Sequence, residues 1–481
     1  MANDVAAAPQ SAPTAESVVA APFERLKAAW RAQRAPLGVD ERLALLAKLQ
    51  AWIVGNQDRV AQAISADFGH RSPHETRAAE IALVVSDLQH TRAHLREWAR
   101  PEPRSTFWGF LPASVRVLRQ PLGIVGVMAP WNYPFQLTAL PLAGAIAAGN
   151  RVLVKPSELT PRTGELVAEM VRAVFPPDMV EVVVGGVDVA AAFARLPLDH
   201  LFFTGSTSVG KLVMKAAAEN LVPVTLELGG KSPAIVHPSF DVERAAASIA
   251  GGKLLNAGQT CIAPDYVLVG RDRLAPFVTA LERAIAANYP RIVDNPDYTS
   301  IASDRHYARL SALLDDAQKK GAEIRQVNPA NEPASGHRKL FPTLVLGATP
   351  DMMVMQDEIF GPILPILPVE TLDEAIGFVN DRPRPLALYY FDDDGRRAED
   401  VLTRTTSGGA AVNATLYHMP QHDLPFGGVG PSGMGRYHGF DSFRTFSHEK
   451  GVFHQTRLNG EATLRPPYGK LFDLAMKLLI R

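Results

Sequence analysis

Hydrophobic residues recur every three or four positions along much of the first hundred residues. In the stretch AAEIALVVSDLQHTRAHLREW, one apolar stripe is made up of Ile81, Val85, Leu88, Leu95 and Trp98. This spacing places side chains on one face of an α-helix. The pattern therefore predicts that residues 22–100 are mainly helical.

The pattern changes after this helical region. The stretch VRVLRQPLGIVGVMAP, residues 115–130, is rich in β-branched residues, and short apolar runs then alternate with helical stretches. The helical stretches are expected at 162–175, 188–195 and 208–220. Alternation of this kind is typical of βαβ units built around a parallel, twisted sheet.

A second series of the same kind begins at Ser232. Its apolar runs are PAIVH, DYVLVG, TLVLG and ALYYF, and helices are expected between them near 241–257, 273–289, 303–321 and 371–382. The sequence thus predicts an α/β protein with two lobes that meet near residues 227–232.

Composition and charge limit the classes of partner. The chain has 481 residues, and its 49 basic and 50 acidic residues give a net charge of −1. No block rich in Lys or Arg is present to neutralise phosphates, so a nucleic-acid partner is not expected. No stretch reaches the ~18 apolar residues that cross a bilayer, so no integral membrane span is expected. The C-terminal KLFDLAMKLLIR is expected to form a small amphipathic helix that packs or touches a surface.

The chain holds a single cysteine, Cys261. One thiol excludes an intrachain disulfide and any multi-cysteine metal site, which indicates a reducing compartment and predicts a cytoplasmic location. The N-terminal MANDVAAAPQSAPTAESVVAAP has no basic start and no sustained apolar run. Residues 1–21 are therefore interpreted as a disordered tail rather than a signal peptide.

Three motif matches do not carry chemistry in this context. GVGPSG at 428–433 fits G-x-G-x-x-G, but it follows HDLPFG rather than a strand. GGKS at 229–232 resembles the end of a P-loop, but the glycine that opens a P-loop is missing. Two histidine pairs at helical spacing lack the Glu of H-E-x-x-H, and we interpret them as surface or packing residues rather than metal ligands. They are His90/His94 and His418/His422.

Two strand ends are candidates for nucleotide binding. In FFTGSTSVGK, Gly205 and Ser206 follow a strand, and Gly210 lies on the first turn of the next helix, where exposed N–H groups bind anions. An ordinary βα turn with a Ser cap would look the same. In VLVKPSELTP, Lys155 and Glu158 end a strand at the sheet edge where open α/β folds bind ligands. Alone, these two could also form a surface ion pair.

Three further residues could carry chemistry together. Cys261 in NAGQTCIAPDY follows a helix and a glycine turn, on a loop where a thiol could meet substrate, although a lone cysteine is more often inert packing. Glu227 in LELGG ends a strand beside two glycines. Asn132 in PWNYP stands between prolines, where its amide could donate to an oxyanion. Each residue alone also has a structural explanation.

These segments together resemble the aldehyde dehydrogenase superfamily over nearly the whole chain, from about residue 22 to 451. The matching segments arrive in family order as APWNYP, VKPSE, FTGSTSVG, LELGGKSP, GQTC, EIFGP and PFGG. The segments CIAPDYVLV, LPFGGVGPSGMGRYHG and FRTFSH resemble the class 3 branch, which includes fatty, aromatic and coniferyl aldehyde dehydrogenases. The C-terminal RPPYGKLFDLAMKLLIR favours the coniferyl type.

The resemblance implies a fold and its division along the chain. It implies a Rossmann-type cofactor domain, an α/β catalytic domain and a small bridging β element for oligomerisation. The implied NAD-binding domain is 22–226, interrupted by bridging strands near 105–122, and the catalytic domain is 227–415. The implied return segment is 416–481, with a bridging strand and a C-terminal tail. A homodimer is implied by the bridging strands.

The resemblance also implies roles for the candidate residues. Cys261 is the nucleophile, Asn132 and the backbone N–H of Cys261 hold the oxyanion, and Glu227 activates water. The residues implied in cofactor binding are Trp131, Lys155, Glu158, Gly205, Ser206, Gly210, Glu358 and Phe360. The implied cofactor is NAD. NADP is the alternative, because the Glu158 side chain can swing away from a 2′-phosphate. The implied product is a carboxylic acid formed through a thiohemiacetal and a thioester.

Other functions remain open from the residues alone. The implied substrate is a small aromatic aldehyde of the coniferyl type, with a medium- or long-chain fatty aldehyde as the alternative. The alternative from another enzyme class is a thiol hydrolase or acyltransferase that uses Cys261 with a histidine, although no Cys–His motif is evident. A catalytically silent binding protein on the same fold is the third hypothesis. The presence of Cys261, Glu227 and Asn132 together argues against it.

Overall fold

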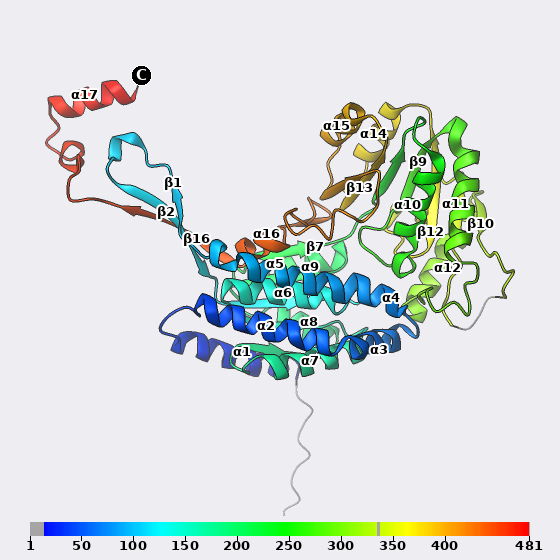
Figure 1. Cartoon of the computed structure of the whole chain (residues 1–481), viewed down its shortest axis with the longest axis horizontal. Coiled ribbons are helices and arrows are strands. Elements are labelled where there is room, and N and C mark those ends of the chain that lie inside the picture. The colour runs from blue at the N-terminus through cyan, green and yellow to red at the C-terminus, as the bar shows by residue number, and fades with distance from the viewer. Residues whose placement is uncertain (1–13, 334–336, 481) are drawn as a thin grey trace, which may run out of the picture.

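Three sheets organise the chain in the computed structural model, which describes residues 14–333 and 337–480 (Figure 1). A six-stranded sheet with its helices forms one lobe, and a seven-stranded sheet forms the other. A three-stranded sheet extends away from both lobes as an arm. The expected α/β class with two lobes and a small separate β element is confirmed.

The six-stranded sheet has the order β15-β7-β6-β3-β4-β5. Its strands are β3 (Ile124–Met128), β4 (Arg151–Lys155), β5 (Val180–Val182), β6 (His200–Thr204), β7 (Val224–Glu227) and β15 (Gly433–Met434). All neighbours are parallel except β15, which pairs antiparallel to β7. The strands are apolar runs rather than alternating ones because helices cover both faces of a parallel sheet.

The helices between residues 15 and 218 pack around this sheet. They are α1 (Ala15–Ala32), α2 (Val39–Gly55), α3 (Gln57–Phe68), α4 (Pro73–Thr76), the π-helix η1 (Arg77–Ala82), α5 (Leu83–Trp98), α6 (Gln136–Ala148), α7 (Pro161–Val174), α8 (Val187–Ala194) and α9 (Thr207–Ala218). Every residue of α6 is buried. An apolar surface all round suits this position, because α6 contacts β3 and β4 as well as α2 and α5.

The prediction of a disordered tail over residues 1–21 is wrong for its last seven residues. Helix α1 begins at Ala15, where the Thr14 side chain accepts a hydrogen bond from the N–H of Ser17. Val19 and Phe23 are buried against the first lobe, and this burial explains why an Ala-rich segment folds. Residues 1–13 of the expected tail lie outside the described residues.

The seven-stranded sheet has the order β10-β11-β12-β9-β8-β13-β14. Its strands are β8 (Pro233–Val236), β9 (Tyr266–Gly270), β10 (Glu323–Gln326), β11 (Thr343–Leu346), β12 (Ile363–Val369), β13 (Ala387–Phe391) and β14 (Gly409–Val412). Only β10 is antiparallel to its neighbour. The surrounding helical elements are α10 (Val242–Leu254), η3 (Leu255–Gly258), η4 (Arg271–Arg273), α11 (Leu274–Asn288), α12 (Asp304–Lys319), α13 (Met353–Gln356), α14 (Leu372–Asn380) and α15 (Gly395–Arg404).

The arm is an antiparallel sheet of β1 (Glu102–Arg104), β2 (Ser114–Pro121) and β16 (Ser447–His454). Strands β2 and β16 pair along eight residues, from Ser447 opposite Pro121 to His454 opposite Ser114. The remaining elements are η2 (Trp108–Phe110), α16 (Gly439–Thr445), η5 (Glu461–Leu464) and α17 (Lys470–Leu479). Helix α17 confirms the expected C-terminal helix, and none of its residues is buried.

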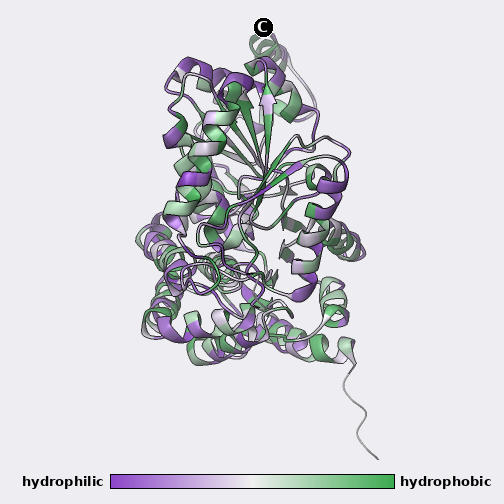
Figure 2. Cartoon of the chain, turned by 90° about the vertical axis from the view of Figure 1, so that its right-hand side faces the viewer, coloured by the Kyte–Doolittle hydropathy of each residue, from purple (hydrophilic) through white to green (hydrophobic). Residues whose placement is uncertain are grey.

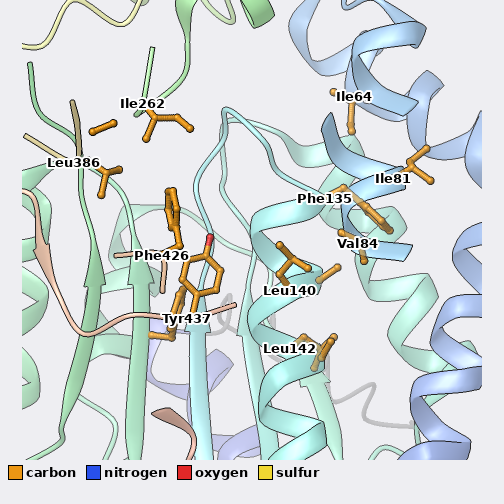
Figure 3. Packing of buried hydrophobic residues seen from close by; sticks show 14 of the residues in the cluster. Ile64, Ile81, Val84, Phe135, Leu140, Leu142, Ile262, Leu386, Phe426 and Tyr437 are labelled. Atoms are coloured by element: carbon orange, nitrogen blue, oxygen red, sulfur yellow. The ribbon is translucent and has the colours of Figure 1, made fainter. Parts of the chain in front are cut away.

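The strands of the sheets consist mainly of hydrophobic residues, whereas the helices around them mix hydrophobic and hydrophilic residues (Figure 2). The largest core cluster contains Val125 of β3 and Val267 of β9, so it is continuous between the two lobes. Figure 3 shows where they meet, with Ile262 above Leu386 and Phe426, and Tyr437 beneath them. Cys261 packs against this cluster. No helix among the described residues is both long and apolar enough to cross a membrane.

Candidate active site

The loop that carries Cys261 begins with an unusual backbone. After α10, Asn256, Ala257 and Gly258 have φ angles of 53°, 50° and 76°, all in the left-handed region. A Cβ on Gly258 would lie 2.3 Å from the carbonyl oxygen of Gly361, so only glycine fits there. Non-glycine residues keep such angles only where their surroundings hold them. This backbone places Cys261 half-buried at the carboxyl side of α10, on the expected loop.

The surroundings of Cys261 favour the neutral thiol in the protein alone. Burial, together with the negative charges of Glu358 and Glu227, raises the pKa of Cys261 to about 12. The backbone N–H groups of Cys261 and Ile262 act in the opposite direction, because they hydrogen-bond the sulfur. A positive charge close to the sulfur would therefore be needed to form the reactive thiolate at neutral pH.

Glu227 is the last residue of β7, as the sequence predicts for a strand end. Its side chain is buried, and neither carboxyl oxygen has a hydrogen-bond partner among the described residues. Burial raises the pKa of Glu227 well above its ordinary range. An unpartnered buried carboxyl is costly for folding, which points to a role in binding or chemistry.

Asn132 lies in the loop between β3 and α6 and is buried. Its Nδ2 donates one hydrogen bond to the carbonyl oxygen of Gln259, at 3.1 Å, two residues before Cys261. An amide nitrogen carries two hydrogens, so the second is available to a ligand. The neighbouring residues also join the two loops, because the Tyr133 hydroxyl lies 2.6 Å from Oγ1 of Thr260.

The predicted ribose-binding residues lie at the carboxyl end of β4. Lys155 is buried, and its Nζ lies 3.2 Å from Oε2 of Glu158. Glu158 is exposed. Its carboxylate can therefore be reached by hydroxyl groups of a ligand, while Lys155 holds its orientation.

The predicted phosphate turn lies between β6 and α9. Ser206 is the N-cap of α9, and its Oγ accepts a hydrogen bond from the N–H of Val209. Gly210 packs closely against Leu228, because a Cβ on Gly210 would lie 2.7 Å from that side chain. Gly205 completes the turn after the strand. The remaining N–H groups at the start of α9 form a site that suits a phosphate anion.

Glu358, Phe360 and Trp131 come from different lobes. The ring centroids of Trp131 and Phe360 are 5.4 Å apart, so these two are direct neighbours. Burial, together with the charge of Asp265, raises the pKa of Glu358 to about 8. A Cβ on Gly229 would lie 2.1 Å from Oε2 of Glu358, so the glycine leaves the space that the carboxyl fills.

The structure therefore brings only part of the predicted set into direct contact. Asn132 is joined to the loop of Cys261 by hydrogen bonds, and the charges of Glu227 and Glu358 act on its thiol. Within the described residues, no hydrogen bond connects Lys155 or Ser206 to that loop. These two lie along the edge of the six-stranded sheet instead.

Sequence reasoning missed several buried charged groups around this site. Lys253 in α10 is buried with its Nζ 3.8 Å from Asp265, and burial lowers its pKa to about 8. The burial of Lys253 could have been inferred from its position in the mainly apolar stretch AAASIAGGKLL. Arg71 and Glu80 form a buried ion pair behind Asn132, and no local pattern in the sequence indicates it.

The arrangement fits a dinucleotide better than a metal ion. Helix α9 offers N–H groups to a phosphate, and Glu158 offers a carboxylate to hydroxyl groups. Both carboxyl oxygens of Glu227, Oε1 of Glu358 and Nζ of Lys253 are buried and have no hydrogen-bond partner among the described residues. Over residues 14–333 and 337–480, no group of three or more His, Cys, Asp or Glu side chains is placed to hold a metal.

Comparisons with known proteins agree with this geometry. The family model described as "Aldehyde dehydrogenase family" matches residues 7–452. "Probable coniferyl aldehyde dehydrogenase" of Pseudomonas aeruginosa is 50% identical over 460 residues, which is 95% of this chain and 96% of that protein. "Aldehyde dehydrogenase, dimeric NADP-preferring" of Rattus norvegicus is 39% identical over 422 residues, which is 88% of this chain and 91% of that protein.

Solved structures give the same result. The "Substrate bound state of Staphylococcus Aureus AldH" matches with a TM-score of 0.90 and 40% identity, covering 96% of this chain and 99% of that chain. An NAD⁺ complex of aldehyde dehydrogenase from Bacillus cereus matches with a TM-score of 0.83 and 25% identity, covering 92% and 90%.

Proposed function

Since the chain belongs to the aldehyde dehydrogenase family, whose members oxidise aldehydes with NAD(P), we propose that Cys261, Glu227 and Asn132 carry this reaction here. One observation carries the proposal. The side-chain amide of Asn132 donates a hydrogen bond to the carbonyl oxygen of Gln259. Its second N–H therefore lies next to the loop that carries the only thiol in the chain. The carboxyl of Glu227, which has no hydrogen-bond partner in the described part of the chain, is close enough to raise the pKa of that thiol.

The first half of the reaction is acylation of Cys261. The thiolate attacks the aldehyde carbon, and the carbonyl oxygen becomes an oxyanion. The second amide hydrogen of Asn132 and the backbone N–H of Cys261 donate hydrogen bonds to this oxyanion. These donors are in place before the negative charge forms. Removing one such donor typically lowers the reaction rate by about 10²–10³. A bound NAD would supply the acceptor for the hydride that leaves the carbon, and its positive ring would favour the thiolate of Cys261.

The second half is hydrolysis of the resulting thioester. Glu227 takes a proton from a water molecule, and the water oxygen attacks the thioester carbon. The C–S bond then breaks, the proton passes from Glu227 to the leaving sulfur, and the carboxylic acid is released with the thiol restored. The carboxyl must be ionised to act as a base, although burial raises its pKa. Because its oxygens have no partner among the described residues, Glu227 can turn towards the water without breaking a hydrogen bond.

We assign cofactor binding to the edge of the six-stranded sheet. Lys155 and Glu158 hold the adenosine ribose, and Gly205, Ser206 and Gly210 hold the pyrophosphate. The nicotinamide ribose is held by Glu358 and Phe360, next to Trp131. NAD is the preferred cofactor because Glu158 repels a 2′-phosphate. NADP remains usable because this side chain is exposed and can move away.

The domain assignment follows from these roles. The cofactor domain begins with α1, at residue 15 rather than 22, and runs to residue 226, with the bridging strands near 105–122 interrupting it. Residues 227–415 form the catalytic domain, and 416–481 form the return segment. The chain passes from one sheet to the other between Glu227 and Pro233, so the proposed base stands at the boundary between the lobes.

We propose an aromatic aldehyde of the coniferyl type as substrate, on the basis of the 50% identical relative. A fatty aldehyde is the alternative, because a 40% identical relative is "Aldehyde dehydrogenase family 3 member A2" of Mus musculus, from the class 3 branch.

We also propose a homodimer joined through the arm, whose aromatic side chains at Phe107, Trp108 and Phe110 are exposed in one copy. The reduced lone thiol suits the cytoplasm.

A kinetic panel tests this proposal. Coniferyl, benzylic, medium-chain and short aldehydes are offered with NAD and with NADP, and cofactor reduction is followed by absorbance. We expect reduction to be fastest with coniferyl aldehyde and NAD, and to be lost in Cys261→Ala while NAD binding is retained. Ester hydrolysis without any cofactor reduction would instead support a thiol hydrolase.

A further inference from the structure

Arg71 and Glu80 form an ion pair that is completely buried behind the Asn132 loop. Nη1 of Arg71 lies 2.6 Å from Oε1 of Glu80, and both side chains are fully shielded from solvent. Arg71 precedes α4, and Glu80 lies in the π-helix η1, an element that is often found at functional sites. In Figure 1, α4 lies where the helices of the first lobe approach α12 of the second.

The pair holds the Asn132 loop at both of its ends. The same Nη1 of Arg71 donates to the backbone carbonyl of Asn132, at 2.9 Å. Oε2 of Glu80 accepts from the backbone N–H groups of Phe135 and Gln136, at 2.8 and 3.0 Å. In Figure 3, Ile81, which follows Glu80 in the chain, lies near Phe135.

The same segment also holds the loop of Cys261. Oε1 of Glu75 accepts from the backbone N–H of Asn256, at 3.1 Å, where the backbone is left-handed. Nδ2 of Asn256 then donates to the carbonyl of Asn132, at 3.0 Å. Residues 71–80 therefore touch both the loop of the oxyanion donor and the loop of the nucleophile.

The incomplete hydrogen bonding of the pair indicates that it fixes the arrangement of the neighbouring loop rather than stabilising the fold. Nε and Nη2 of Arg71 have no hydrogen-bond partner among the described residues. The guanidinium instead lies over the rings of Tyr133 and Phe68, with Cζ 4.7 and 5.2 Å from the ring centroids. A buried ion pair with incomplete hydrogen bonding is weak evidence for stability, and fixing one arrangement is a role that such pairs can serve.

We propose that Arg71 and Glu80 are a positioning pair that sets the distance and orientation of the Asn132 amide relative to Cys261. This inference rests on the proposed roles of Asn132 and Cys261. Neither Arg71 nor Glu80 touches substrate in this account. Their effect on the reaction passes through the backbone of residues 132–136, so it depends on the presence of the Asn132 amide.

A double-mutant cycle on the full-length enzyme tests the inference. Arg71→Met, Asn132→Ala and the double variant are compared by kcat/KM for the aldehyde, by the rate of the first turnover and by NAD affinity. We expect Arg71→Met to lower kcat/KM about ten- to hundredfold in the wild-type background and less than threefold in the Asn132→Ala background. NAD affinity and the alkylation rate of Cys261 are expected to change less than threefold.

Two further variants cover the case in which Arg71→Met fails to fold. Glu80→Gln keeps the shape of the side chain and one acceptor oxygen, and Arg71→Met/Glu80→Gln leaves no buried charge without a partner. Both should slow acylation as Arg71→Met does. Arg71→Lys should restore the rate to within about fivefold of wild type, because one nitrogen makes both bonds of Arg71.

The surface pair Arg59–Glu169 is the matched control. Its atoms are 2.7 Å apart, but both side chains are about half exposed, so Arg59→Met should leave kcat/KM unchanged. Equal losses from Arg71→Met with and without the Asn132 amide would overturn the positioning role, as would a wild-type rate in Arg71→Met. A wild-type rate in Asn132→Ala would overturn the proposed function itself, and the inference with it.

Discussion

Replacing Glu227 with Gln separates the two halves of the proposed reaction. The two side chains have nearly the same shape, and the carboxyl makes no hydrogen bond among the described residues that Gln would lose. Acylation of Cys261 needs no base at this position, whereas hydrolysis of the thioester does. General base catalysis contributes about 10²–10⁴ in rate. We therefore expect kcat to fall by about that factor, with a burst of one reduced cofactor per active site retained.

The same substitution has a predicted effect on stability. Burial holds the pKa of Glu227 in the folded protein above that in the unfolded chain. At pH values above the pKa of Glu227 in the unfolded chain, the carboxyl is ionised in the unfolded chain but still protonated in the folded protein. The free energy of unfolding therefore falls as the pH rises. The fall is about 1.4 kcal/mol per pH unit until the folded pKa is reached. Gln cannot ionise, so Glu227→Gln should become the more stable protein over that window.

Stopped-flow measurement of cofactor reduction gives the burst and the steady rate, and urea unfolding at several pH values gives the stability. The wild-type steady rate should rise with pH while the carboxyl ionises, and the variant should lack this rise. A steady rate in Glu227→Gln equal to wild type would refute the role as base. Parallel stability curves for the two proteins as the pH rises above the ordinary range of a Glu pKa would refute the raised pKa of Glu227.

Further predictions follow from single features of the site. Asn132→Ala should lower kcat/KM by about 10²–10³ without changing NAD affinity measured by fluorescence titration, because one oxyanion donor is lost. Alkylation of Cys261 by iodoacetamide should be slow at neutral pH, and its rate should rise as the pH approaches about 12. Adding NAD should accelerate alkylation at neutral pH, and a rate independent of NAD would contradict the proposal that a positive charge favours the thiolate. Gly258→Ala should lower the free energy of unfolding by about 1–3 kcal/mol in urea titration, because of its left-handed backbone and the nearby carbonyl of Gly361. Glu158→Gln should raise kcat/KM for NADP relative to NAD, and an unchanged ratio would argue against its contact with the ribose.

Local patterns in the sequence were enough to predict the two lobes and the ends of several strands. Glu227 and Lys155 follow apolar runs bounded by glycine or proline, and such runs are strands in a buried parallel sheet. The sequence did not predict β15, because its two residues, Gly433 and Met434, lie in a glycine-rich segment that looks like a turn. That strand exists because β7 offers it a free edge.

The organisation of the candidate site was less accessible to sequence reasoning. The resemblance to a family suggested Asn132 and Cys261, but no pattern indicated how they are held together. Arg71 and Asn132 are 61 residues apart in the chain and meet only in the folded protein. The start of α1 was missed for a similar reason, because its Ala-rich sequence is stabilised by burial of Val19 and Phe23 against distant strands.

The central claim is that the aldehyde carbon becomes bonded to Cys261 as an acyl group, and mass spectrometry can test it directly. Glu227→Gln is mixed with NAD and an aromatic aldehyde, quenched in acid and digested, and the peptide that contains Cys261 is weighed. This is the only cysteine in the chain, so the assignment of a thioester is unambiguous. The account predicts the added mass of one acyl group on this peptide, formed only when NAD is present. An unmodified peptide after a full burst of cofactor reduction, or an acyl group on another residue, would contradict it.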